Sequence, residues 1–154
     1  MGSEMCIRDS ILAYHSYKTN KVPTLIIDAG TFVTMDVVTE LGFQGGYIIP
    51  GLKNYFSVFS QGEQLKAVEL NPHFTHALPQ DTGEAMTESY TAFVALAKKL
   101  IQQHKIQKII LTGGLCTLWE SFFLEEKGSL IVESNPHLIH WALQHWMTTQ
   151  IEPL

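Results

Sequence analysis

The chain has 154 residues, of which 45% are hydrophobic and 16% are charged, a balance typical of one globular domain with a sizeable core. Its formal net charge of -5 and its scattered Lys and Arg residues argue against nucleic-acid binding, and no apolar run is long enough to cross a bilayer. The two cysteines, Cys6 and Cys116, are too few for a disulfide framework, so we expect a cytoplasmic protein in a reducing setting.

The first ten residues, MGSEMCIRDS, read as a foreign leader, and we exclude residues 1–10 from the fold prediction. One domain is then expected over residues 11–150. A short helix is predicted from Ser10 to about Tyr17, and a connecting loop follows it from Lys18 to Pro23.

The most informative segment is LIIDAGTFVTMD, from Leu25 to Asp36, which predicts a β-hairpin with a phosphate-binding turn. Its apolar start indicates a buried strand, and the alternation after Phe32 indicates the returning strand. In the turn, Gly30 permits positive φ and a close approach of backbone N–H groups to an anion, while the Thr31 hydroxyl adds a donor. Asp28 would repel a phosphate directly, so it would act through a bound cation or water. An ordinary hairpin with a polar turn is the alternative.

A third strand is predicted within FQGGYIIPG, from Phe43 to Gly51, where paired glycines precede a β-branched core. Pro50-Gly51 then opens an irregular segment or the start of a helix. Apolar residues at helical spacing predict a helix from Leu52 to Phe59 that packs in the core.

The stretch from Gly62 to Pro79 is polar and rich in turn residues. It contains His73 and His76, which could form part of a metal site. Exposed histidines are the favoured interpretation, because they flank an apolar residue and have no clear Cys or acidic partners.

A strong apolar stripe predicts one long helix from Met86 to Gln103. Further on, KIILTGG, from Lys108 to Gly114, predicts a strand that ends in two glycines, where the backbone could lie against a nucleotide base or ribose.

Two helices are predicted in the last part of the chain. One runs from Thr117 to Glu126 after the paired glycines, and the other begins at Asn135-Pro136 and runs to about Met147. No internal repeat or low-complexity segment interrupts this pattern.

Together, IIDAGTFVTMD, GFQGGYIIPG and IILTGG closely resemble the C-terminal half of the type III pantothenate kinases, members of the acetate and sugar kinase, heat-shock and actin superfamily. The resemblance extends from about Ile11 to Trp146. It implies an α/β fold, a ribonuclease H-like (actin-like ATPase) half-domain with a mixed sheet flanked by helices. The predicted order of strand, strand, strand, helix and then strand, helix, strand, helix is compatible with one such half.

The resemblance also implies roles for the residues of the hairpin. Its D-x-G-T-x-x-T-x-D segment is similar to the family's second phosphate motif. Asp28 would therefore help to coordinate a monovalent cation, potassium or ammonium, and Gly30 and Thr31 would bind the phosphates of ATP.

Two further segments carry implied ligand contacts. Gly113 and Gly114, after Thr112, match the family's third motif and would bind ATP beside the adenosine. Thr82 is the best match to a threonine that contacts pantothenate at the start of a long helix. The implied ligands are ATP, magnesium, the monovalent cation and pantothenate, and the implied assembly is a homodimer. Tyr90 and Phe93 could lie at its interface, and packing inside the molecule is the alternative, which their spacing does not distinguish.

Two family motifs do not occur in this sequence: the first phosphate loop, D-x-G-N-T, and G-x-D-R, which carries the general-base aspartate. Near Ser3 to Cys6, where G-x-D-R would fall, the sequence reads Ser-Glu-Met-Cys. Arg8 and Asp9 have the right residue types in reversed order, so we assign no catalytic residue. The length of the chain agrees with a truncated kinase.

Two functional hypotheses follow from the resemblance. In the first, the parent protein is an enzyme that uses ATP to phosphorylate pantothenate to 4′-phosphopantothenate, the first step of coenzyme A biosynthesis. This chain would then be an inactive or impaired fragment. In the second, the protein is a non-catalytic nucleotide-binding or transcriptional accessory factor of the same family.

Overall fold

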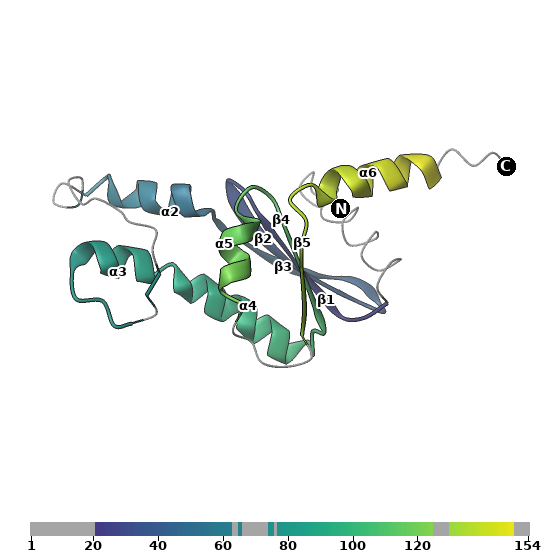
Figure 1. Cartoon of the computed structure of the whole chain (residues 1–154), viewed down its shortest axis with the longest axis horizontal. Coiled ribbons are helices and arrows are strands. Elements are labelled where there is room, and N and C mark those ends of the chain that lie inside the picture. Colours follow the sequence, from purple (N-terminus) through teal and green to yellow (C-terminus); the bar gives the residue numbers. More distant parts are fainter. Residues whose placement is uncertain (1–20, 63–64, 66–73, 76, 125–129, 150–154) are drawn as a thin grey trace.

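The structure is a computed structural model that describes residues 21–62, 65, 74–75, 77–124 and 130–149 (Figure 1). Its centre is one mixed sheet with the strand order β3-β2-β1-β4-β5. The strands are β1 (Thr24–Ala29), β2 (Phe32–Thr39), β3 (Gly42–Pro50), β4 (Lys108–Thr112) and β5 (Ile131–Ser134). β2 is antiparallel to both β1 and β3, whereas β4 is parallel to both β1 and β5. The predicted mixed sheet is confirmed.

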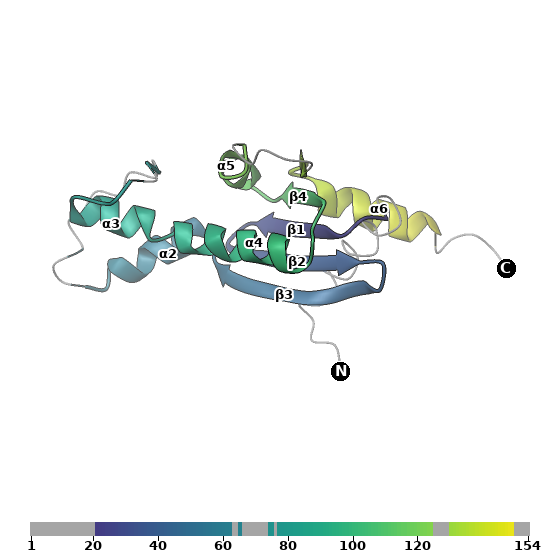
Figure 2. The same ribbon diagram turned by 90° about the horizontal axis from the view of Figure 1, so that it is seen from below.

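Helices cover both faces of this sheet (Figure 2). They are α2 (Leu52–Phe59), α3 (Thr82–Glu88), α4 (Thr91–Gln103), α5 (Cys116–Ser121) and α6 (Leu138–Thr149). Side chains of α4 and α5, among them Ala97 and Trp119, join the larger core on one face. Leu138 and Ala142 of α6 join a smaller core on the other face.

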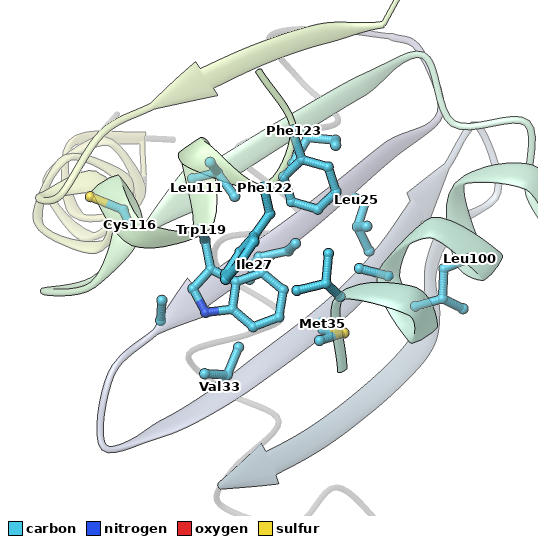
Figure 3. Close-up of a cluster of buried hydrophobic side chains, with 14 of the residues drawn as sticks. Leu25, Ile27, Val33, Met35, Leu100, Leu111, Cys116, Trp119, Phe122 and Phe123 are labelled. Atoms are coloured by element: carbon cyan, nitrogen blue, oxygen red, sulfur yellow. The ribbon is translucent and has the colours of Figure 1, made fainter. Parts of the chain in front are cut away.

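Strand β1 lies in the middle of the sheet, with β2 on one side and β4 on the other. All of its residues are buried, as expected for a strand that is covered on both faces. Successive side chains point to opposite faces, so Leu25 and Ile27 lie in the larger core and Ile26 lies in the smaller one. In Figure 3 the side chains of β1 and β2 meet those of α5 and the segment that follows it, including Trp119 and Phe122.

The prediction of one continuous helix from Met86 to Gln103 is wrong, because this stretch forms two helices, α3 and α4, that are separated by Ser89 and Tyr90. The Ser89 hydroxyl donates to the carbonyl of Met86 at 2.9 Å, and the Thr91 hydroxyl donates to the carbonyl of Glu88 at 2.6 Å. Hydroxyl groups that bond nearby carbonyls in this way compete with regular helix geometry. Tyr90 is fully buried between the two helices, so it packs inside the molecule.

Most other predicted elements agree with the structure. The helix from Leu52 to Phe59 has the predicted bounds. The helix predicted from Thr117 is shorter than expected, since α5 ends at Ser121. The last helix begins two residues after Pro136, because the Asn135 side chain accepts a hydrogen bond from the His137 amide at 3.1 Å and forms a turn before it.

Some predictions fall outside the described residues: the leader 1–10, the helix from Ser10 to Tyr17, and His73 and His76. Within the described part of the chain, no helix is both long and apolar enough to cross a membrane.

Candidate functional site

The predicted phosphate turn and the paired glycines meet at one edge of the sheet. β1 and β4 are parallel neighbours, and Asp28 pairs in register with Thr112. The carboxyl ends of parallel strands lie at the same edge, so the β1–β2 turn and the loop after β4 come together. A hydrogen bond from the Leu115 amide to the Ala29 carbonyl, at 2.9 Å, joins the two segments.

Gly113 lies close to Asp28 at this edge. Gly113 has φ of +83°, and a Cβ at this position would lie 2.5 Å from Asp28 Oδ1 and 2.7 Å from the Ala29 carbonyl oxygen. Only glycine fits such an approach without strain. The Asp28 carboxylate is buried, with 6% of the residue exposed, and it lies directly beside the loop that carries the paired glycines.

The turn itself is tight and partly exposed. The Gly30 amide donates to the Phe32 carbonyl at 3.0 Å, and both Thr31 and Phe32 are exposed. At Gly30 the sequence permits positive φ, but Gly30 is not among the glycines that adopt it. The turn closes instead through its own hydrogen bond, and the left-handed glycine of the site is Gly113.

The start of α2 also contacts the turn. The sequence did not predict this contact. The Thr31 carbonyl accepts hydrogen bonds from the Gly51 amide at 3.0 Å and from Asn54 Nδ2 at 2.9 Å. A Cβ on Gly51 would lie 2.3 Å from the Gly30 carbonyl oxygen, so this glycine is required by close packing. The Pro50-Gly51 pair predicted an irregular segment or the start of a helix at this position. Nothing near Asn54 in the sequence indicates its hydrogen bond to the Thr31 carbonyl.

Gly114 and Thr82 differ in their relation to this edge. Gly114 directly follows Gly113, and it is exposed with open space around it. Thr82 is exposed at the first residue of α3, and Figures 1 and 2 both place α3 at the outer end of the molecule, away from the sheet. The structure therefore brings Asp28, Gly30, Thr31, Gly113 and Gly114 together and leaves Thr82 apart.

Two threonine side chains flank Asp28 on one face of the sheet. Thr34 of β2 and Thr112 of β4 are its direct neighbours in register, so all three side chains share a face. The Thr34 hydroxyl is buried and has no hydrogen-bond partner among the described residues. Carboxylate and hydroxyl oxygens suit hard cations and not soft metals. No group of three or more His, Cys, Asp or Glu in the described ranges could hold a metal ion by itself.

Tyr90 has a shifted pKa, and it lies in the core, where its ring packs edge-on against that of Trp119 of α5. Burial raises the pKa of Tyr90 to about 12, while the nearby Trp119 indole, which does not form a direct hydrogen bond with it, partly opposes this rise. The hydroxyl therefore stays protonated at neutral pH, and we assign Tyr90 no acid–base role because its side chain is fully buried in the core.

Comparison with known families matches this chain to kinases. A family model described as type III pantothenate kinase matches residues 7–103. The chain is 27% identical over 126 residues to the type III pantothenate kinase of Campylobacter jejuni, which covers 75% of this chain and 59% of that protein. It is 35% identical over 100 residues to that of Helicobacter hepaticus, covering 64% of this chain and 48% of that protein. The chain spans about half the length of the curated relatives it matches.

Solved structures are similar in fold. One, described as a Baf family transcriptional activator from Campylobacter jejuni, has a TM-score of 0.64 at 21% identity and covers 90% of this chain and 64% of that one. Another, described as a 2-dehydro-3-deoxygalactonokinase from Sinorhizobium meliloti, has a TM-score of 0.61 at 14% identity and covers 95% of this chain and 60% of that one. At these identities the likeness concerns the fold alone, and it confirms the expected ribonuclease H-like (actin-like ATPase) architecture.

Proposed function

The chain belongs to the type III pantothenate kinase family, and we propose that it supplies the nucleotide side of that family's reaction. In this reaction ATP phosphorylates pantothenate to 4′-phosphopantothenate, the first step of coenzyme A biosynthesis. The observation that carries the proposal is the convergence of Asp28, the Gly30–Thr31 turn and Gly113 at one edge of the sheet.

The turn and the paired glycines bind ATP in this proposal. Thr31 is exposed, so its hydroxyl can donate to a phosphate oxygen. Gly113 and Gly114 have no side chains. Their backbone is therefore open to contact with the nucleoside beside the turn. This arrangement supports a nucleotide that lies across the turn and the loop after β4.

Asp28 holds a monovalent cation, potassium or ammonium, in the same proposal. The unpartnered Thr34 hydroxyl on the same face fits this role, because a cation would supply the interaction that the described residues do not give it. Bound cations, this one and the magnesium that accompanies ATP, offset the negative charge of the phosphates. The residues of this chain orient the nucleotide and keep the Asp28 carboxylate away from direct contact with phosphate.

Pantothenate is the proposed substrate, with Thr82 as its proposed contact. Because α3 lies away from the turn in this chain, such a contact requires either a movement of α3 or a second copy, as in a homodimer. No residue of this chain is proposed as the general base, since the sequence contains no G-x-D-R motif. We therefore expect pantothenate phosphorylation by this chain to be undetectable or severely reduced. A cytoplasmic location is part of the same proposal.

A non-catalytic nucleotide-binding or transcriptional accessory factor is the second candidate. It differs from the first candidate in requiring neither D-x-G-N-T nor G-x-D-R, the two family motifs that this sequence does not contain. The two candidates share nucleotide binding and differ in turnover. Recovery of the upstream coding sequence discriminates them, because a kinase parent should encode both motifs. A complete upstream region that lacked both would contradict the enzyme.

Nucleotide binding by the chain is tested by titration calorimetry with a non-hydrolysable ATP analogue, magnesium and potassium. We expect the wild-type chain to bind, and Thr31→Ala to weaken the affinity about tenfold through the loss of a hydrogen bond to a charged group. Thr39→Ala is the matched control, since Thr39 lies at the other end of β2. Absence of binding by the wild-type chain, or equal affinity of Thr31→Ala, would contradict the proposal.

A further inference from the structure

The Thr31 carbonyl links the proposed phosphate turn to α2. It accepts one hydrogen bond from the Gly51 amide and a second from Asn54 Nδ2, at 3.0 and 2.9 Å. A carbonyl oxygen has two lone pairs, so both of its acceptor positions are used. Asn54 is 23 residues from Thr31 in sequence, which makes its hydrogen bond a tertiary contact and not part of the turn.

The orientation of this carbonyl decides the orientation of the next amide. A trans peptide is planar, and its C=O and N–H groups point in opposite directions. Since the Thr31 carbonyl points toward α2, the Phe32 N–H points away from α2. The residues on either side of this peptide, Thr31 and Phe32, are exposed, so an anion can approach the turn.

Helix α2 is itself held in place by contacts that do not involve the turn. The Tyr55 hydroxyl and the Ser89 hydroxyl lie 2.5 Å apart, which joins α2 to the junction between α3 and α4. The Tyr55 ring also packs edge-on against Tyr90 and Phe93, with ring centroids 5.3 and 5.7 Å apart. Asn54 is therefore presented to the turn from a helix with an independent anchor.

We propose that Asn54 is a positioning residue for phosphate binding. By holding the Thr31 carbonyl, it keeps the Thr31–Phe32 peptide turned so that the amide N–H faces an incoming phosphate. It makes no contact with the ligand in this role. The inference rests on the proposed function of the Gly30–Thr31 turn, and it adds a residue from a different element to that site.

Hydrogen exchange measured by NMR on the free chain tests the positioning itself. Loss of one hydrogen bond corresponds to a change of about two- to tenfold in local opening, so Asn54→Ala should speed the exchange of the Gly30 and Gly51 amides by that factor. The Leu115 amide, which bonds to Ala29 behind the turn, should keep its rate. Unchanged rates at both turn amides would overturn the inference.

Titration with the non-hydrolysable ATP analogue tests the consequence for binding. We expect Asn54→Ala to weaken the affinity about three- to tenfold, and Asn54→Ser, which keeps a donor, to recover part of the loss. Tyr55→Phe is the matched control: it removes a hydrogen bond from the neighbouring residue of the same helix and keeps the ring. It should change neither the affinity nor the exchange of the turn amides, because the ring keeps α2 packed against Tyr90 and Phe93.

The outcomes separate this inference from the proposed function. A wild-type chain that does not bind the analogue would overturn the proposed function. A wild-type chain that binds, together with an Asn54→Ala variant of equal affinity and equal amide exchange, would overturn only the role of Asn54. Equal losses in Asn54→Ala and Tyr55→Phe would also overturn it, because the effect would then come from α2 as a whole.

Discussion

Asp28 Oδ1 lies where a side chain on residue 113 would begin, 2.5 Å from the Cβ position of Gly113. The carboxylate belongs to β1 and the glycine directly follows β4, the parallel neighbour of β1, and each limits what the other position can hold. This relationship yields the first prediction.

Gly113→Ala should destabilise the chain, because alanine at φ of +83° is strained and its Cβ would overlap with Asp28 and Ala29. A loss of about 2 kcal/mol or more in the free energy of unfolding is expected from urea titration. Gly114→Ala is the control, since nothing lies within 4 Å of its Cβ position. Equal stability of the two variants would show that residue 113 tolerates a side chain.

Gly51→Ala should weaken both folding and nucleotide binding. Its Cβ would lie 2.3 Å from the Gly30 carbonyl oxygen and 2.6 Å from the Thr31 carbonyl oxygen, so the turn must move. We expect a loss of about 1–3 kcal/mol in urea unfolding and a weaker affinity for the ATP analogue in calorimetry. Gly62→Ala, whose Cβ would make ordinary contacts of 3.4 Å or more, should change little. A Gly51→Ala variant with wild-type affinity would contradict the packing argument.

Asp28→Asn should abolish the dependence of nucleotide binding on a monovalent cation. The affinity for the ATP analogue is measured in potassium chloride and in choline chloride at equal ionic strength. For the wild-type chain we expect tighter binding in potassium, and for Asp28→Asn the same weak binding in both salts.

The control for this charge change is Asp81→Asn. Asp81 accepts the Glu84 amide as the N-cap of α3, and asparagine caps helices equally well. Its potassium response should equal that of the wild-type chain. An unchanged potassium response in Asp28→Asn would refute the cation role of Asp28.

Tyr90 should make the chain less stable as the pH rises above 10. The pKa of its hydroxyl is about 12 in the folded chain, raised by burial from 10.0. The folded state then keeps a proton that the unfolded state has released, so stability falls by about 1.4 kcal/mol per pH unit between these two values. The contribution is fully present below pH 10.

Tyr90→Phe removes this titration, so the difference in unfolding free energy between wild type and variant should change with pH only above 10. Urea unfolding at several pH values between 8 and 11.5 measures it. At neutral pH the variant should be equally stable or more stable, because it removes a buried hydroxyl with no hydrogen-bond partner among the described residues. A pH-independent difference would contradict the raised pKa.

The sequence predicted the elements whose signals are local. Strands at Leu25 and Phe32 and the helix from Leu52 to Phe59 follow from apolar patterns within a few residues of each other. The break at Ser89 escaped prediction, because the apolar stripe continues through it while the hydroxyl bonds and the burial of Tyr90 act against a continuous helix.

The candidate site was predictable only in part, because some of its contacts join residues that are far apart in the sequence. Paired glycines after a strand indicated a close approach, but only the pairing of β1 with β4 shows that Gly113 meets Asp28. The residue type of Gly30 permits positive φ but does not require it, and the turn closes through the hydrogen bond from the Gly30 amide to the Phe32 carbonyl. Asn54 had no local signal, since its partner Thr31 is remote in sequence.

The contacts of α2 also limit how the length of this helix can change. Asn54 reaches the turn and Tyr55, the next residue, reaches Ser89, so two distant partners depend on one helical register. Successive residues of an α-helix are rotated by about 100°, so a single deletion between Gly51 and Asn54 would turn both side chains away together. Homologous chains that keep both contacts should therefore show substitutions between Gly51 and Tyr55 but neither insertions nor deletions there.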